Sequence, residues 1–234
     1  MSTFISGSRV RYAVYFAPAS DSPWWQAGCR WLGRDPEQRI SGLDATARLR
    51  DSPRRYGFHA TLKAPFQLAD GCSEAQLLAC AGVFASHQTA LEVPLPAVRL
   101  LGSFLALQAG GPVPQISTLA QDCVRHFDVL RAAPGTAELA RRGNVPLTAR
   151  QQVLLQQWGY PYTEEEFRFH MTLSDNLTNV EPAMTQAMAE DARAAFAQAM
   201  AVPLVIDGIA IFREATSAAP LELVARFGFG GLPQ

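Results

Sequence analysis

Two short stretches of the chain carry the same motif: Phe58 to Leu62 (FHATL) and Phe169 to Leu173 (FHMTL). They share Phe, His, Thr and Leu in the same order and differ only in the middle residue. A helix-like pattern follows each stretch, and each helix is followed by Val-Pro-Leu, at 93–95 and at 202–204. Because motif, element order and spacing agree, we interpret the pair as an internal duplication rather than chance among common residues.

Length and composition are those of a folded globular protein. The chain has 234 residues, 48% of them apolar and 18% charged, which suits one large domain or two small lobes. We predict one domain over 1–234, with a first repeat at about 56–109 and a second at about 167–228. The net charge of −1 argues against an extended nucleic-acid partner. No apolar run is long enough to span a membrane, and four cysteines without a Cys-x-x-Cys pair favour a reduced, cytoplasmic protein.

The remaining patterns predict strands and helices along the whole chain. Strands are expected at 10–16, 56–66, 167–174, 204–212 and 221–227, with two more around a turn within 91–108. Helices are expected at 22–32, 73–87, 115–131 and 181–200, with a short helix around 44–50 and helical pieces within 134–157. Residues 158–162 are expected to form a loop.

The two motif strands each have a polar face. Side chains on a strand alternate between its two faces, so His59, Thr61 and Lys63 are expected to share one face of the first strand. The matching face of the second strand is expected to carry Arg168, His170, Thr172 and Ser174. The opposite rows are apolar and suit a core. A slip of one residue would bury the histidines, so we expect the register to be well fixed.

These residue types suit chemistry at phosphorus. Two histidines with pKa values near ~6.5 can act as base and acid at neutral pH, and threonine hydroxyls can bind phosphoryl oxygens. Lys63, the only lysine of the chain, and Arg168 can neutralise phosphate charge. No metal is then needed. A single His-x-Thr is more often structural, and the lysine alone suits a solvated surface. The matched pair favours a catalytic role, and the residues leave open which histidine is the acid.

Other side chains are weaker candidates. The proposed substrate-binding residues are Lys63, Arg168, Tyr56, Ser174, Arg11 and Tyr15. Arg11 and Tyr15 share a face of the first strand and are expected to line a cleft, although a surface arginine and a core tyrosine would look the same. Tyr160 and Tyr162 suit a stacking surface or a lid, or simple packing. The arginine pair at 54–55 suits either the steering of anions or solvation.

The motifs resemble those of the 2H phosphoesterase superfamily, which is named for two His-x-(Thr/Ser) motifs, each followed by an apolar residue. The longer strings at 11–16, 56–66 and 167–173 are similar to a bacterial branch labelled phosphonate-metabolism proteins. The resemblance implies a two-lobed α+β fold, LigT-like, with antiparallel sheets around a pseudo-twofold axis. It also implies outer helices and an active cleft between the lobes.

The resemblance further implies metal-independent chemistry, without a cofactor, on phosphodiesters such as cyclic nucleotide or ribose phosphates. Carried over to this chain, His59 and His170 form the acid–base pair, and Thr61 and Thr172 hold phosphate oxygens. We therefore predict a cyclic phosphodiesterase with a small phosphorylated substrate. Two alternatives stay open. One is a non-catalytic sensor of a phosphorylated ligand, and the other is an RNA-end phosphodiesterase or ligase, which would need a basic track.

Overall fold

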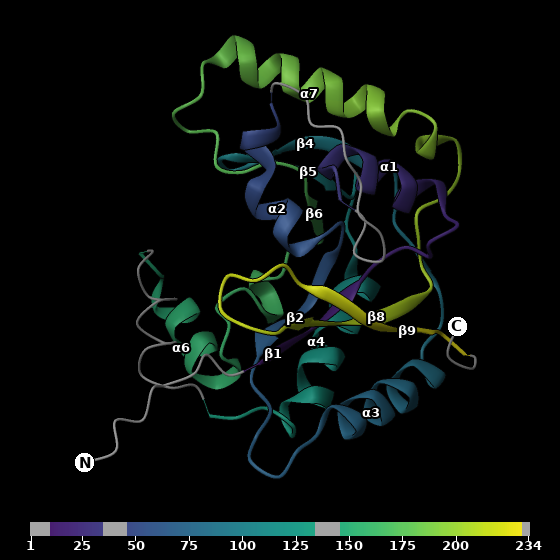
Figure 1. The fold of residues 1–234 in the computed structure, drawn as a ribbon, viewed down its shortest axis with the longest axis vertical. Coiled ribbons are helices and arrows are strands. Elements are labelled where there is room, and N and C mark those ends of the chain that lie inside the picture. The colour runs from purple at the N-terminus through teal and green to yellow at the C-terminus, as the bar shows by residue number, and fades with distance from the viewer. Residues whose placement is uncertain (1–9, 35–45, 134–145, 231–234) are drawn as a thin grey trace.

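The computed structural model describes residues 10–34, 46–133 and 146–230 (Figure 1). The strands are β1 (Arg11–Phe16), β2 (Ala60–Phe66), β3 (Leu91–Glu92), β4 (Ala97–Leu101), β5 (Phe104–Gln108), β6 (His170–Thr172), β7 (Val205–Ile206), β8 (Gly208–Glu214) and β9 (Glu222–Gly228). The helices are α1 (Pro23–Leu32), α2 (Asp51–Tyr56), α3 (Glu74–Ser86), α4 (Pro114–Asp128), α6 (Ala149–Trp158) and α7 (Pro182–Phe196). Short 3-10 helices are η1 (Ala47–Arg50), η2 (Glu164–Glu166) and η3 (Ala199–Ala201).

One seven-stranded sheet runs through the molecule in the order β4-β5-β6-β2-β1-β8-β9, and β3 pairs with β7 apart from it. The strand pairs are antiparallel. The helices lie around the sheet, with α3 and α4 toward one end of the view in Figure 1 and α7 and α1 toward the other. The predicted α+β class with an antiparallel sheet and outer helices is confirmed.

The strand order has an internal symmetry about the β2–β6 junction. Six of its seven strands match in pairs about this junction, β2 with β6, β1 with β5 and β8 with β4, and β9 is an additional strand at one edge. The same correspondence matches β3 with β7, and these two strands pair with each other. The order favours repeat units that begin at β1 and at β5, earlier than the predicted limits of about 56–109 and 167–228. The duplication itself stays a prediction.

Local signals set the ends of two helices where the sequence predicts them. The hydroxyl of Ser22 accepts from the backbone N–H of Trp24, and Gly33 ends α1 with a left-handed φ of 63°. Ser73 and Gln76 form a reciprocal capping box at the start of α3. These contacts satisfy backbone groups that a helix end leaves without partners, so the ends are encoded within a few residues.

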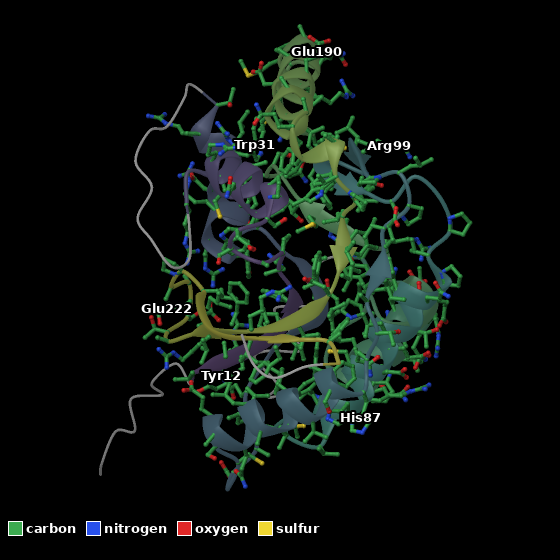
Figure 2. All side chains as sticks on the ribbon, turned by 90° about the vertical axis from the view of Figure 1, so that its right-hand side faces the viewer. Tyr12, Trp31, His87, Arg99, Glu190 and Glu222 are labelled. Carbon is green, nitrogen blue, oxygen red and sulfur yellow. The ribbon has the colours of Figure 1, made fainter. Side chains whose placement is uncertain are left out.

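One large apolar cluster joins the sheet to its helices. Residues that alternate along the strands, such as Val14, Leu62 and Met171, pack with Phe127 of α4 and Phe196 of α7. A smaller cluster on the opposite face joins β1 and β8 to α1. Figure 2 shows charged groups such as Glu190 and Glu222 at the periphery, and Trp31 among the ribbons. Both faces of the sheet are therefore covered by packed side chains at β1.

Two predicted strands are shorter in the structure. The expected strand at 56–66 begins at Ala60, because 51–56 forms α2 and Gly57 then turns the chain with a φ of 83°. The expected strand at 167–174 is reduced to β6. The helical pieces expected within 134–145 and the start of the short helix expected at 44–50 lie outside the described residues.

Two helical glycines provide a test of packing beside the first motif. A Cβ at Gly28 would lie 2.1 Å from Cγ of Phe58, whereas a Cβ at Gly82 would lie 3.7 Å from the Phe227 ring. We expect Gly28→Ala to lower the free energy of unfolding by about 1–3 kcal/mol through overpacking. Gly82→Ala, with the same gain in helix propensity, should raise it by about 0.5–1 kcal/mol. Urea denaturation of both variants tests this, and equal effects would contradict it.

Candidate active site

The site is built on the two central strands, β2 and β6. Ala60 lies opposite Met171 in their antiparallel pairing, and both side chains are buried in the main core. Because side chains alternate, the residues on either side of this pair lie on the opposite face of the sheet. We call this the histidine face. It carries His59, Thr61, His170 and Thr172.

The antiparallel register brings each histidine beside the threonine of the other motif. Counting outward from the Ala60–Met171 pair, Thr61 lies opposite His170, and His59 lies opposite Thr172. The expected polar faces of the two strands are therefore combined into one surface. Within the first motif, the Thr61 hydroxyl also lies 3.3 Å from Nε2 of His59.

Both imidazoles are held in the same way by the backbone. Nδ1 of His59 donates to the carbonyl oxygen of Gly57 at 2.9 Å, and Nδ1 of His170 donates to that of Arg168 at 2.7 Å. Each carbonyl belongs to the residue two positions before its histidine. Since a carbonyl only accepts, Nδ1 carries the proton in each neutral ring. Nε2 is then the nitrogen that can take up a proton, in both motifs.

Burial makes both histidines weaker bases than usual. It lowers the pKa of His59 from 6.5 to about 4; the Gly57 carbonyl opposes this shift and the charge of protonated His170 adds to it. Burial also lowers the pKa of His170, and the Arg168 carbonyl opposes this. Both rings are therefore neutral at neutral pH in the free protein. As pH rises, His59 loses its proton before His170 does, because the His170 charge acts on it.

Aromatic rings surround His59. The Tyr15 ring stacks on His59, with 3.8 Å between centroids and 22° between planes. The Tyr56 ring is 6.2 Å away and the Phe212 ring 6.5 Å away. These rings displace water from one side of the imidazole, which accounts for the large shift of its pKa.

His170 opens onto a pocket of about 430 Å³. The pocket is lined by Thr61, Leu101, Phe104, Tyr160, Tyr162, Glu166, Phe167, Arg168 and His170. The Phe104 ring is 5.7 Å from the His170 ring, and Tyr160 and Tyr162 meet edge to face with centroids 5.5 Å apart. The lining thus combines aromatic side chains with a few polar and charged groups, which is the usual make-up of a small-molecule site.

The predicted face of Lys63 is wrong. Thr61 pairs with Tyr15, but Lys63 pairs with Val14, so β2 has one extra residue between the two pairs. This β-bulge reverses the alternation and turns the Lys63 side chain to the opposite face. Without the bulge, Lys63 would have lain on the same face of β2 as His59.

Lys63 is a structural anchor rather than a phosphate ligand. Its side chain is 3% exposed, and Nζ donates to the backbone oxygen of Val124 at 3.0 Å and to Asp128 at 3.1 Å. Asp128 also binds Arg131. The expected contact with substrate is therefore corrected: Lys63 fixes β2 to α4.

Ser174 also does not serve the histidine face. Its side chain is buried, and its hydroxyl accepts from the backbone N–H of Leu105 and donates to the backbone oxygen of Asp175, both at 2.8 Å. Because the Ser174 hydroxyl proton is donated to Asp175, it cannot also be donated to a substrate. The expected binding role is corrected, because regular strand geometry ends at Thr172 and alternation no longer applies beyond it.

The other candidates lie near the site. Arg168 is exposed at the rim of the pocket, where Nη1 donates to two backbone oxygens and so orients the guanidinium. Tyr56 is half-buried beside His59, and Tyr15 is fully buried against it. Arg11 lies on the same face of β1 as Tyr15, where it forms an ion pair with Glu214. Their roles in binding stay predictions.

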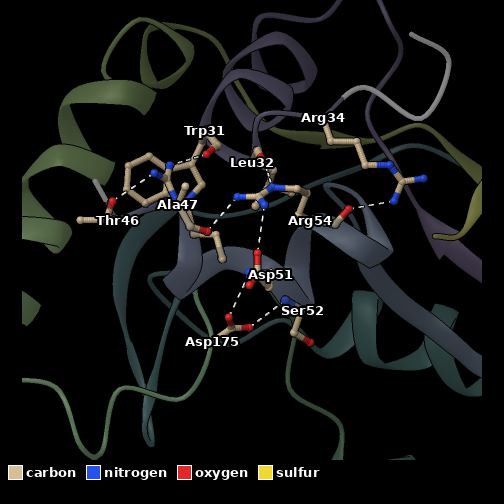
Figure 3. Close-up of polar contacts among 10 residues, drawn as sticks. Trp31, Leu32, Arg34, Thr46, Ala47, Asp51, Ser52, Arg54 and Asp175 are labelled. Atoms are coloured by element: carbon tan, nitrogen blue, oxygen red, sulfur yellow. Dashed lines mark hydrogen bonds and ion pairs between the residues drawn. The ribbon is translucent and has the colours of Figure 1, made fainter. Parts of the chain in front are cut away.

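Sequence reasoning missed a contact that joins the two motifs. Asp175, just after the second motif, accepts from the backbone N–H groups of Asp51 and Ser52 at the start of α2, as Figure 3 shows. Helix α2 leads directly to the first motif. Arg54 ties the same helix to the backbone oxygens of Leu32 and Ala47. An aspartate at this distance in sequence gives no local signal of such a cap.

Within the described part of the chain, no three His, Cys, Asp or Glu side chains gather closely enough to hold a metal ion. None of the helices in the same ranges combines the length and the apolar character that crossing a membrane requires.

The fold and site together define an α+β protein with two similar histidine motifs on adjacent strands at the centre of one antiparallel sheet. The chain belongs to the family described as "Protein of unknown function (DUF1045)", whose model matches residues 61–222.

Curated relatives share the sequence along most of this chain. A protein from Janthinobacterium sp. (strain Marseille), named "Ribose 1,5-bisphosphate phosphokinase PhnN", is 47% identical over 97% of this chain and 52% of its own length. A protein of the same name from Laribacter hongkongensis (strain HLHK9) is 38% identical over 92% of this chain and 50% of its own length. The chain thus spans about half the length of these relatives.

Solved structures resemble the fold more distantly. Escherichia coli LigT, solved with NADP+, is 14% identical with a TM-score of 0.43, covering 97% of this chain and 100% of that one. Kluyveromyces marxianus Usb1 is 9% identical with a TM-score of 0.35, covering 93% and 99%. Both TM-scores are below 0.5, so neither likeness bears on the chemistry of the site.

The corrected role of Lys63 gives a test. We expect Lys63→Met to lower the free energy of unfolding by about 1–3 kcal/mol, because it leaves a partly buried Asp128 with one partner fewer. The affinity for ribose 5-phosphate, measured by calorimetry, should not change. A large loss of affinity in a folded Lys63→Met protein would restore the lysine as a phosphate ligand.

Proposed function

We propose that the protein hydrolyses a cyclic phosphodiester on a small ribose phosphate, with His59 and His170 as its acid–base pair. One observation carries the proposal: two neutral imidazoles on adjacent strands have the same protonated nitrogen, Nδ1, bound to the backbone, which leaves Nε2 for proton transfer. The resemblance of both motifs to the 2H phosphoesterases rests on the same residues and agrees with this assignment.

The pKa values favour His59 as the base and His170 as the acid. A pair whose environments push the pKa values apart divides the two roles. In the proposed step, Nε2 of His59 takes a proton from water while the water oxygen attacks phosphorus. The bond from phosphorus to one ring oxygen breaks, and that oxygen takes the proton from Nε2 of His170. Water and one diester bond are consumed, and a phosphate monoester and a hydroxyl are formed.

The side chains around the two histidines suit the negative charge on the phosphoryl oxygens. The hydroxyls of Thr61 and Thr172 can donate to the phosphoryl oxygens, and Arg168 offers a cation at the rim of the pocket. Arg168 keeps Nε and Nη2 without partners among the described residues, so both can donate to a phosphate. Aromatic side chains line much of the remainder of the pocket.

The name of the relatives supports a ribose phosphate as the substrate. If the ribose carries a 5-phosphate and a 1,2-cyclic phosphate, opening the ring at the 2-oxygen gives ribose 1,5-bisphosphate. This is the compound in the relatives' name. A hydrolase in the half of the relatives that this chain matches would then supply the substrate of a kinase in their other half. The present chain has one lysine, Lys63, which is buried, and no Gly-x-x-x-x-Gly-Lys loop to hold a nucleoside triphosphate.

Alanine substitutions test the acid–base pair. We expect His59→Ala and His170→Ala each to reduce kcat by ~10²–10⁴-fold, the usual contribution of one general acid or base. Phosphorus NMR of chelator-treated protein with ribose 1,2-cyclic and nucleoside 2′,3′-cyclic phosphates measures turnover and shows which bond breaks. The exposed His87 provides the control, and His87→Ala should retain full activity.

Full activity in both motif variants would exclude the mechanism. Saturable binding of these phosphates without turnover by the wild-type protein would favour the phosphate sensor instead.

The pH profile tests the assignment of roles. The active form has neutral His59 and protonated His170, and kcat/KM reports the free enzyme. Activity should rise as pH falls from neutral through the lowered pKa of His170, since more of it is then protonated. It should fall again toward about 4, where His59 becomes protonated. We therefore expect an optimum below pH 6.5, and an optimum above neutral pH would contradict the assignment.

A further inference from the structure

A second charged cluster lies beside the acid–base pair. Glu214, at the end of β8, is 1% exposed and forms ion pairs with Arg11 through Oε2 and with Arg55 through Oε1. Its Oε1 also accepts from the backbone N–H of Ala218 at 3.1 Å. One carboxylate between two guanidinium groups leaves a net charge of +1, so the cluster attracts an anion rather than satisfying itself.

The Arg55 guanidinium is fixed in position by its contacts. Nε donates to the backbone oxygen of Ala219 at 3.0 Å, Nη1 to the Tyr56 hydroxyl at 3.0 Å, and Nη2 to Glu214. Nη1 and Nη2 each keep a second N–H that has no partner among the described residues. The Tyr56 hydroxyl accepts from Arg55, so its own proton remains available to a further acceptor.

Arg11 adds donors of the same kind. Its Nε and Nη2 bind Glu214, and its Nη1 has no partner in the described ranges. Its side chain is 12% exposed and that of Arg55 25% exposed, so both are partly accessible from solvent. Preorganised guanidinium groups and a phenol are the donors that proteins use for phosphate monoesters.

The cluster is one side chain away from His59. The Arg55 Cζ lies 4.8 Å from the Tyr56 ring centroid, and that ring is 6.2 Å from His59. From the other direction, Tyr15 stacks on His59. Arg11 lies on the same face of β1 as Tyr15, because the two residues are four positions apart on a strand that pairs regularly with β8. The cluster and the proposed base therefore share one side of the histidine face.

We propose that Arg11, Arg55 and Tyr56 form a second anion subsite, which binds a phosphate monoester carried by the substrate away from its cyclic phosphate. This inference rests on the proposed function and specifies its substrate class: a ribose cyclic phosphate that also bears a terminal phosphate. A phosphate monoester carries roughly −1.5 to −2 charges at neutral pH and three acceptor oxygens, which match the charge and the donors of the cluster. Glu214 holds both guanidinium groups in place and is a positioning residue.

Two substrates that differ in one group provide the test: ribose 1,2-cyclic phosphate with and without a 5-phosphate. The quantity measured is the ratio of their kcat/KM values. We expect the wild-type protein to prefer the 5-phosphorylated compound, and Arg55→Gln to lower the ratio about 10- to 100-fold. Tyr56→Phe, which removes one oxygen and preserves packing, should lower it about 2- to 10-fold. It keeps the test decisive if Arg55→Gln does not fold.

Arg213 provides a matched control. It neighbours Glu214 on β8, but its ion pairs are with Glu74 and Glu222, on the other side of the strand. Arg213→Gln removes the same charge from nearly the same place and should leave the ratio unchanged. An unchanged ratio in Arg55→Gln and Tyr56→Phe would overturn the proposal. So would a loss of discrimination in Arg168→Gln instead, because the second phosphate would then lie in the pocket beside His170.

Binding separates this inference from the proposed hydrolysis. Calorimetry with ribose 5-phosphate, on the wild-type and Arg55→Gln proteins, needs no turnover. If no cyclic phosphate is hydrolysed but Arg55→Gln weakens this binding at least tenfold, the hydrolase fails and the anion subsite stands. If hydrolysis occurs and both proteins bind ribose 5-phosphate equally, the subsite fails and the hydrolase stands.

Discussion

The pairing of β2 with β6 is the constraint on which the site depends. It joins two segments far apart in sequence at the centre of the sheet and sets Ala60 against Met171 in the core. With those two side chains buried, the motif histidines and threonines must lie together on the other face. A slip of one residue would place two imidazoles in an apolar core, so the packing that stabilises the fold also fixes the geometry of the site. The cap that Asp175 gives α2 strengthens the same junction.

The electrostatics of the site follow from where water is excluded. Tyr15 and its aromatic neighbours remove water from His59, which destabilises the protonated ring. The Gly57 carbonyl offsets part of that cost through Nδ1, and the same bond fixes the tautomer. The Arg11–Glu214–Arg55 cluster adds positive charge nearby without placing a cation in contact with the imidazole. The proposed base, which is neutral at neutral pH, can thus lie beside the proposed anion subsite.

Sequence patterns predicted what depends on neighbours along the chain. Ser22, Pro23 and Gly33 mark the ends of α1, and strand alternation placed the motif residues on one face. The same alternation failed at Lys63, because the bulge arises from how β2 aligns with β1 and leaves no trace within β2 itself. It also failed at Ser174, which lies past the end of the strand. The partners of Glu214 come from β1 and α2, so its role depends on the tertiary fold and could not be inferred from its local sequence.

The two motifs are alike in sequence but differ in surroundings, and the proposed division into base and acid rests on that difference. In identical environments the surroundings would not determine which histidine is the base and which the acid. Here the first motif follows Gly57 and lies beneath Tyr15, whereas the second follows Arg168 and faces an open pocket. The surroundings are also asymmetric, with the Arg11–Glu214–Arg55 cluster on the side of His59 and the aromatic pocket on the side of His170, so the proposed substrate would bind in one direction. The symmetric strand order supplies two equivalent positions, and the side chains packed around them make the positions chemically distinct.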